Sequence, residues 1–160
     1  METFDETTRR RFLGLATAAA TGVMVGGLTD RAGATPPAGT MAREPLALGR
    51  LDEHVTVATF EPSDFHVHRV VVQPGADSGW HTHPGTALDV VTAGALTLYM
   101  GESGCQSRRI DAGQAVFVPK GVPHLARNEG TEPAEAYITY LVTAGAEPRT
   151  DAAKPGNCPS

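Results

Sequence analysis

Two histidines separated by a single residue, His81 and His83, lie near the middle of the chain in the pattern Gly-x5-His-x-His that begins at Gly75. In a β-strand, residues i and i+2 point to the same face, with their Cα atoms about 6.5–7 Å apart. Two imidazoles at these positions can therefore converge on one ion, while Thr82 between them points the other way. The spacing predicts a pair of metal ligands on one face of a strand.

A second cluster has the pattern Gly113-x5-Pro119-x-Gly121-x2-His124-x3-Asn128. Its glycines and proline predict a turn, and His124 follows this turn at the start of a predicted strand. Five fixed residues at fixed offsets have a chance frequency on the order of one in a million per start position, from average residue usage. The cluster is therefore a specific signal.

Together the two clusters resemble motifs one and two of the cupin superfamily, and the resemblance covers roughly Val55 to Val142. It implies an all-β fold, a single jelly-roll barrel of six to eight strands. It also implies that His81, His83 and His124 point into the barrel and bind one divalent transition metal. Neutral imidazole suits several such ions, so Fe, Mn, Ni, Cu and Zn all remain candidates. A barrel whose site no longer binds metal is the alternative.

The chain departs from the cupin pattern at one ligand position. Cupin motif one places a glutamate ligand six residues before a glycine, and counting back from Gly94 gives Ala87, which cannot bind a metal. Asp89 lies on the same strand face, but about 6.5–7 Å further along it. We expect Asp89 to hydrogen-bond to a ligand or to bound water, and by position it is the best candidate for a catalytic acid or base.

A site with three histidines and no carboxylate has two chemical consequences. Three protein ligands leave open positions for water, substrate or O₂, as in catalytic metal sites. The missing glutamate also raises the net charge of the site by one unit, which favours an anionic or enolate-like ligand.

Other polar and aromatic side chains have less specific patterns. His66 and His68 share a strand face and could form a second metal pair, although polar residues on a solvent-facing strand are the simpler interpretation. One of Tyr99, Tyr137 and Tyr140 could face the metal as a proton donor, but a core aromatic residue is the default expectation. Trp80 should point away from His81 and pack outside the cavity.

Short apolar runs separated by Gly and Pro turns predict the strands that would carry these residues. Such a series indicates a sandwich or barrel, and the length of 160 residues fits one domain. The predicted strands are Val55–Phe60, His66–Gln73, Ala87–Ala93, Ala95–Met100, Ala115–Val118 and Ala136–Val142.

The N-terminus does not look like part of this fold. Arg9, Arg10 and Arg11 precede an uncharged segment that ends at Thr29, and the whole resembles a twin-arginine signal peptide. Small residues at 32–34 fit a cleavage site. We expect export to the periplasm, the cell envelope or the medium, with no stable membrane span after processing; an uncleaved anchor is the alternative. The predicted organisation is a signal peptide at 1–34, a linker at 35–45, the cupin domain at 46–145 and an irregular tail at 146–160.

The two cysteines, Cys105 and Cys158, lie in a predicted turn and in the tail. An exported protein enters an oxidising space, and an even number of cysteines permits a bridge. We predict a disulfide that holds the tail, with two free surface thiols as the alternative.

Several functions fit these features. The first is a mononuclear metal-dependent enzyme of dioxygenase type that acts on a small molecule. The alternatives are a binding module for a small molecule or metal, and an isomerase or lyase that uses the metal as a Lewis acid. The net charge of −5, without a basic cluster outside the N-terminus, argues against a nucleic-acid partner. A homodimer is one assembly compatible with the sequence.

Overall fold

The computed structural model describes residues 39–40, 42–102, 104–156 and 158. Across these residues the chain forms β-strands and no helix. The strands are β1 (Ser63–Val72), β2 (His81–Thr82), β3 (Thr86–Ala93), β4 (Ala95–Met100), β5 (Gln106–Asp111), β6 (Ala115–Val118), β7 (His124–Arg127), β8 (Ala134–Thr143) and β9 (Thr150–Asp151).

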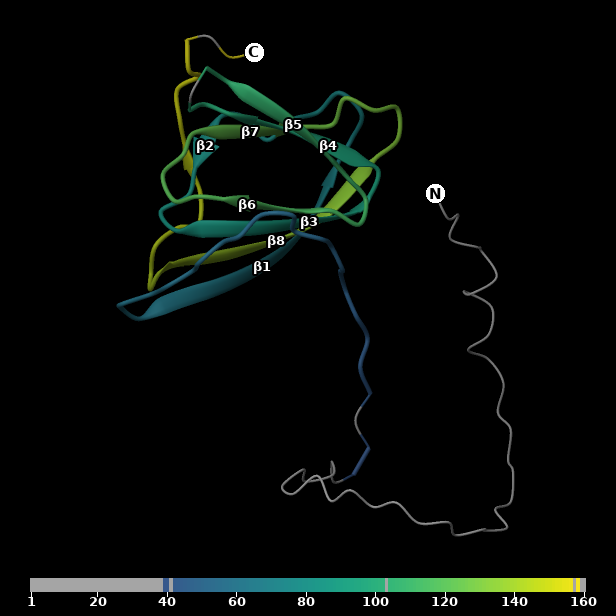
Figure 1. The fold of residues 1–160 in the computed structure, drawn as a ribbon, viewed down its shortest axis with the longest axis vertical. Helices are drawn as coiled ribbons and strands as arrows, with labels where there is room; N and C mark the ends of the chain where they lie inside the picture. Colours follow the sequence, from purple (N-terminus) through teal and green to yellow (C-terminus); the bar gives the residue numbers. More distant parts are fainter. Residues whose placement is uncertain (1–38, 41, 103, 157, 159–160) are drawn as a thin grey trace, which may run out of the picture. The chain divides into compact units, whose positions relative to one another are not determined.

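The strands form two antiparallel sheets that face each other (Figure 1). One sheet has the order β1-β8-β3-β6, and the other has the order β5-β4-β7-β2-β9. Consecutive strands thus often lie in different sheets, which is the connectivity of a jelly roll. The predicted fold class, a single all-β jelly-roll domain, is confirmed.

The register of the strands decides which side chains meet inside. β1 and β8 pair along their whole length, from Ser63 opposite Thr143 to Val72 opposite Ala134. In the other sheet, the two residues of β2 lie between β7 on one side and β9 on the other. This short strand places His81 directly opposite His124.

The core lies between the two sheets because alternate residues of each strand point inward. In β8, Ala134, Ala136, Tyr140 and Val142 are buried, whereas the residues between them are less so. They pack with Ile110 and other buried residues of β3, β4 and β6 in one cluster. Each fully buried valine or isoleucine contributes about 1.5–3 kcal/mol, so this cluster is the main source of stability for the barrel.

Gly94 shows why the tight connection from β3 to β4 needs a glycine. Its φ is +64°, in the left-handed region, and an added Cβ would lie 2.9 Å from the carbonyl oxygen of Pro133. A side chain at this position would be both strained and obstructed.

Five of the six strands predicted from apolar runs are present, with small changes at their ends. The prediction of a strand at Val55–Phe60 is wrong: no described strand pairs with this segment, and Phe60 is 97% exposed. The sequence does not predict β5, because only Ile110 on this strand is buried and the strand therefore lacks an apolar run. The tail is less irregular than predicted, since β9 pairs with β2.

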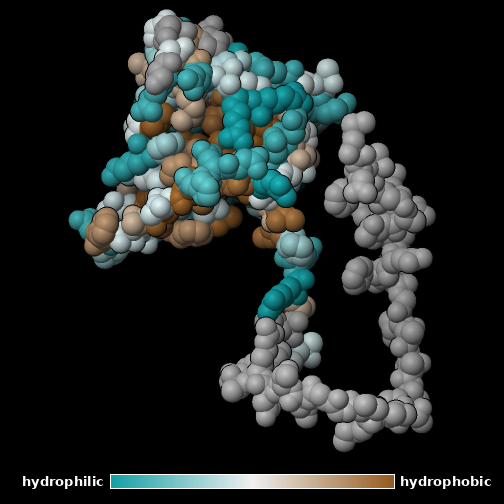
Figure 2. Space-filling model, in the orientation of Figure 1, coloured by the Kyte–Doolittle hydropathy of each residue, from teal (hydrophilic) through white to brown (hydrophobic). Residues whose placement is uncertain are grey.

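The outward face of β1 is largely apolar. Phe65, Val67 and Val71 lie on this face at the edge of the sheet, and all three are exposed, with the exposed Arg69 between the two valines. Figure 2 shows brown apolar side chains along this side of the molecule.

Residues Ala42–Ser160 form one unit. The predicted signal peptide at 1–34 lies outside the described residues, as does part of the predicted linker at 35–45. In the described part of the chain, no helix is long and apolar enough to cross a membrane.

Candidate metal centre

The three predicted ligands meet inside the barrel. His81 lies in β2, His83 follows this strand, and His124 begins β7; their exposed fractions are only 6%, 2% and 3%. The ring centroids are 4.2 Å apart for His81 and His124, 4.9 Å for His81 and His83, and 4.7 Å for His83 and His124. One potential ligand atom from each imidazole lies within 4.8 Å of the other two. The group has the spacing needed to hold one metal ion.

Backbone carbonyl groups fix the tautomer of each imidazole. The Nδ1 atoms of His81, His83 and His124 lie 2.9, 2.8 and 2.9 Å from the carbonyl oxygens of Gly79, Pro148 and Val122. A carbonyl oxygen only accepts hydrogen bonds, so each Nδ1 must carry the proton and donate it. Each Nε2 then keeps its lone pair, which is the state that binds a metal.

The electrostatics of the site agree with this assignment. Burial lowers the pKa of His81 to about 4 and that of His124 to about 3, and it also lowers the pKa of His83. All three imidazoles are therefore neutral at pH 7. Three neutral nitrogen donors in a buried cluster fit a divalent transition metal.

The histidines line a cavity of about 240 Å³. Its wall is formed by residues of both sheets, from β1, β3 and β8 in one and from β2, β4 and β7 in the other, and polar residues alternate with apolar ones. The apolar lining residues are Val70, Val72, Leu96, Ala126, Ala136 and Ile138; the other polar ones are Ser78, Asp89, Tyr140 and Arg149. Such a cavity suits a small organic ligand that has both an apolar part and polar groups.

Asp89 lines this cavity from β3, opposite Ile138 on β8. Its Oδ1 atom is buried and has no hydrogen-bond partner among the described residues. Burial raises the pKa of Asp89 to about 7. Ala87 lies on the same face but is completely buried in the core cluster and is not among the residues that line the cavity. The carboxyl group of Asp89 therefore lines the cavity two residues along β3 from Ala87.

Tyr140, one of three tyrosines considered from the sequence, is the one that reaches the site. Its ring lies 4.8 Å from that of His83, and burial, together with the nearby charge of Asp89, raises its pKa to about 12. Its hydroxyl group is therefore a hydrogen-bond donor throughout the physiological range. Tyr99 instead lies against Glu129, to which its hydroxyl group donates.

His66 and His68 do not join the three-histidine group. The ring of His68 lies 5.3 Å from that of Tyr140 and 6.1 Å from that of His66. His68 is exposed, although it lies on the same face of β1 as Val70 and Val72, which line the cavity. The Nε2 atom of His66 is buried and has no hydrogen-bond partner within the described residues.

The C-terminal tail (residues 144–156 and 158) closes one side of the site, which sequence reasoning missed. Pro148 accepts the hydrogen bond from His83, and Arg149 lines the cavity. The tail runs beside β2 (Figure 1), where Asp151 pairs with His81. No local pattern marks Arg149, because the tail reaches the cavity only through long-range contacts.

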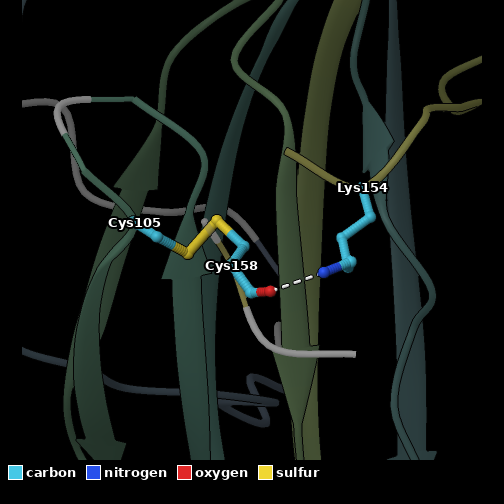
Figure 3. The surroundings of a disulfide bond; sticks show 3 residues. All are labelled: Cys105, Lys154 and Cys158. Carbon is cyan, nitrogen blue, oxygen red and sulfur yellow. Dashed lines mark hydrogen bonds between the residues drawn. A yellow bond between two sulfur atoms is a disulfide. The ribbon is translucent and has the colours of Figure 1, made fainter. Parts of the chain in front are cut away.

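A disulfide joins Cys105 to Cys158, the pair that the sequence suggested (Figure 3). Lys154 donates a hydrogen bond of 2.8 Å to the carbonyl oxygen of Cys158. Trp80 and Leu125 are buried beside Cys158, so Trp80 packs away from the metal cluster as predicted. The end of the tail is thus fixed to the turn between β4 and β5.

Comparison with known proteins supports the fold. Residues 68–140 match the cupin domain family. Peruvianin-I, a cysteine peptidase from the latex of Thevetia peruviana, is 21% identical, with a TM-score of 0.50 over 56% of each chain. No curated protein matches the sequence of this chain.

Two further solved structures are similar at a lower TM-score of 0.49. The DMSP lyase DddQ from Ruegeria pomeroyi is 23% identical over 57% of this chain and 45% of its own. An uncharacterized protein with a double-stranded β-helix domain from Klebsiella pneumoniae is 21% identical over 68% of this chain and 92% of its own. The chain spans about half the length of peruvianin-I and of DddQ. At 21% identity, the likeness to peruvianin-I concerns the fold alone.

Proposed function

We propose that this chain, whose residues 68–140 carry a cupin domain, is an exported metal-dependent enzyme of dioxygenase type that acts on a small anionic molecule. One observation carries the proposal. Three buried imidazoles each give their Nδ1 proton to a backbone carbonyl group, which leaves three Nε2 lone pairs close together.

A divalent ion bound by His81, His83 and His124 would supply positive charge and open coordination positions for O₂ and an anionic substrate. The protein itself orients the imidazole rings and shapes the cavity. The carbonyl oxygens of Gly79, Val122 and Pro148 hold the rings in orientation, and the apolar wall limits the access of water. No carboxylate belongs to the three-residue ligand group, so nothing in that group competes with an anionic substrate for the charge.

Asp89 and Tyr140 would handle protons in this cavity. Because the pKa of Asp89 is about 7, its carboxyl group can hold or release a proton near neutral pH. The hydroxyl group of Tyr140 stays protonated and can donate a hydrogen bond to bound substrate. The same Asp89 favours a second candidate function, an isomerase or lyase, since such reactions need a group that takes up and returns a proton.

Export is the second part of the proposal. The twin-arginine pattern at residues 9–11 motivates it, and the disulfide supports it because such bonds persist in oxidising compartments. Replacing Arg9 and Arg10 with lysine should retain the protein in the cytoplasm. N-terminal sequencing of the exported form should return Thr35; a sequence that starts at Met1 would indicate an uncleaved anchor.

Metal content together with O₂ consumption tests the function. After reconstitution, the full chain should hold close to one divalent metal ion, and His81→Ala, His83→Ala or His124→Ala should each remove most of it. His54 is exposed and does not belong to the three-histidine group, so His54→Ala is the control and should leave the content unchanged. The loaded protein is then offered a panel of diketones, catechols and small carboxylates in an O₂ electrode.

The possible results separate the candidates. Uptake of O₂ with one substrate class supports the dioxygenase. Substrate conversion without O₂ uptake supports the isomerase or lyase, and binding without conversion supports a binding module. Full metal content in His124→Ala would show that the site is wrongly assigned.

A further inference from the structure

Arg149 lies in the tail, and two contacts hold its guanidinium group near the cavity of the three histidines. Nη2 donates to the carbonyl oxygen of Ser78 at 2.7 Å, and Nη1 lies 2.5 Å from Oδ1 of Asp151. A guanidinium group is planar and carries five N–H groups, so these two contacts set its plane and leave N–H groups for a ligand. Arg149 also forms part of the cavity wall.

Arg149 places a positive charge beside the metal cluster. It lines the same cavity as the three histidines, and its neighbour Pro148 accepts the hydrogen bond from His83. Its partner Asp151 offsets part of this charge, and because the side chains of Arg149 and Asp151 are 41% and 83% exposed, solvent screens both. The tail thus adds a cationic group to a cavity wall whose three imidazoles are neutral.

Asp89 lines the same cavity from β3, and its buried Oδ1 atom has no hydrogen-bond partner among the described residues. The apolar residues Val70, Leu96 and Ile138 also line this cavity. The cavity thus combines a cationic group, apolar surface and a separate carboxyl group.

From this arrangement we propose that Arg149 anchors the carboxylate of the substrate, which is a small monocarboxylate with an apolar body. This inference rests on the proposed function and names its substrate class. A planar carboxylate fits the N–H fork of a guanidinium group, and such charge-assisted hydrogen bonds are stronger than neutral ones. The volume of about 240 Å³ lies below the usual range of ligand pockets, about 300–1,000 Å³, which limits the body to a few carbon atoms.

The test compares an anion with its neutral isostere. Binding of butyrate and of butyramide to the zinc-reconstituted full chain is measured by calorimetry for the parent protein, Arg149→Gln and Arg149→Lys. Arg149→Gln should weaken butyrate binding about tenfold to a hundredfold, the range expected when a hydrogen bond to a charged group is lost, and leave butyramide binding unchanged. Arg149→Lys keeps the charge and should give an intermediate loss.

Arg109→Gln is the matched control. Arg109 also pairs with an aspartate two residues further along the chain, Asp111, but it lies in β5 outside the cavity. The Arg109→Gln variant should bind butyrate as tightly as the parent protein does. Far-ultraviolet circular dichroism and a disulfide assay show whether each variant keeps its fold and its tail.

The results test the role of Arg149 separately from the proposed metal site. If Arg149→Gln keeps the parent preference for butyrate over butyramide, or if the parent shows no such preference, Arg149 is not the anchor. Zinc content is measured on the same samples. Loss of zinc from the parent would contradict the proposed metal site, whereas normal zinc content with an unchanged preference would contradict only the anchor.

Discussion

The metal cavity is built from two regions that are held in place by different means. The barrel strands place His81 and His124 by direct backbone pairing, and the turns around them supply the carbonyl groups that orient the rings. The tail reaches the same cavity through a two-residue strand, one hydrogen bond from His83 and a disulfide. The comparison suggests a division of roles in which the barrel supplies the ligands and the tail supplies charge.

Removing the disulfide should separate these roles and have the largest effect on stability. Cys105 and Cys158 are 53 residues apart, for which chain entropy gives about 4 kcal/mol at most. Cys105→Ser combined with Cys158→Ser should lower the free energy of unfolding by about 3–4 kcal/mol, measured by denaturation in urea. Zinc content should stay near that of the parent, while the preference for butyrate should fall.

One outcome would contradict this division, and another would show that the disulfide is not needed for it. Loss of zinc in the double variant, in protein that is still folded, would mean that the tail also maintains the histidine cluster through Pro148. An unchanged preference for butyrate would mean that β9 and the His83 hydrogen bond hold Arg149 without the disulfide. Ser107→Ala, an exposed change in the adjacent strand β5, is a suitable control.

The same contrast explains what the sequence could predict. His81 and His83 belong to one short segment, and strand periodicity alone puts them on one face; the resemblance to cupins then added His124. Periodicity also put Asp89 on the inward face. In each case, the information lies within a few neighbouring residues.

The failures are positions where partners are distant in the sequence. Val55–Phe60 has the composition of a strand, but strand formation needs a partner, and none of the described strands provides one. Arg149 lies in a polar segment whose place in the cavity depends on pairing with β2, across about half of the chain. A single sequence carries no local signal of such contacts.

A second prediction concerns the barrel, where the protonation of Asp89 should make stability depend on pH. Its pKa is about 7 in the folded protein, compared with an ordinary value of 3.8. The folded state therefore holds this proton more tightly than the unfolded state does, and the contribution of Asp89 to stability is lost as the pH rises from about 4 to about 7. Asp89→Asn removes the ionisation and should stabilise the metal-free protein by at most about 4 kcal/mol at pH 8, and by much less at pH 4.

Unfolding in urea at pH 4, 6 and 8 measures this difference. The three histidines and Tyr140 face the same cavity but are present in both proteins, so the difference between the two curves isolates Asp89. Parallel curves for the parent and Asp89→Asn would show that Asp89 is ionised in the folded state, and its role as a proton carrier would fail. Asp64→Asn, a change at a carboxylate that accepts a hydrogen bond from the backbone of Gly145, should not reproduce the effect.

The smallest expected effect on stability concerns the two exposed ion pairs that join residues i and i+2. Arg149 pairs with Asp151 in the tail, and Arg109 pairs with Asp111 in the barrel. Exposed pairs of this kind contribute about 0–1 kcal/mol, so Asp151→Asn and Asp111→Asn should both change the free energy of unfolding by less than about 0.5 kcal/mol.

The effects of these two substitutions on butyrate binding should differ, because Arg149 lines the cavity and Arg109 does not. Removing the charge of Asp151 leaves that of Arg149 less balanced and should strengthen butyrate binding about twofold to fivefold, a change within the range for an exposed charge, while Asp111→Asn leaves it unchanged. If Asp151→Asn instead weakens butyrate binding with normal zinc content, the main function of Asp151 is to hold the guanidinium group in place, and the tail acts by geometry more than by charge.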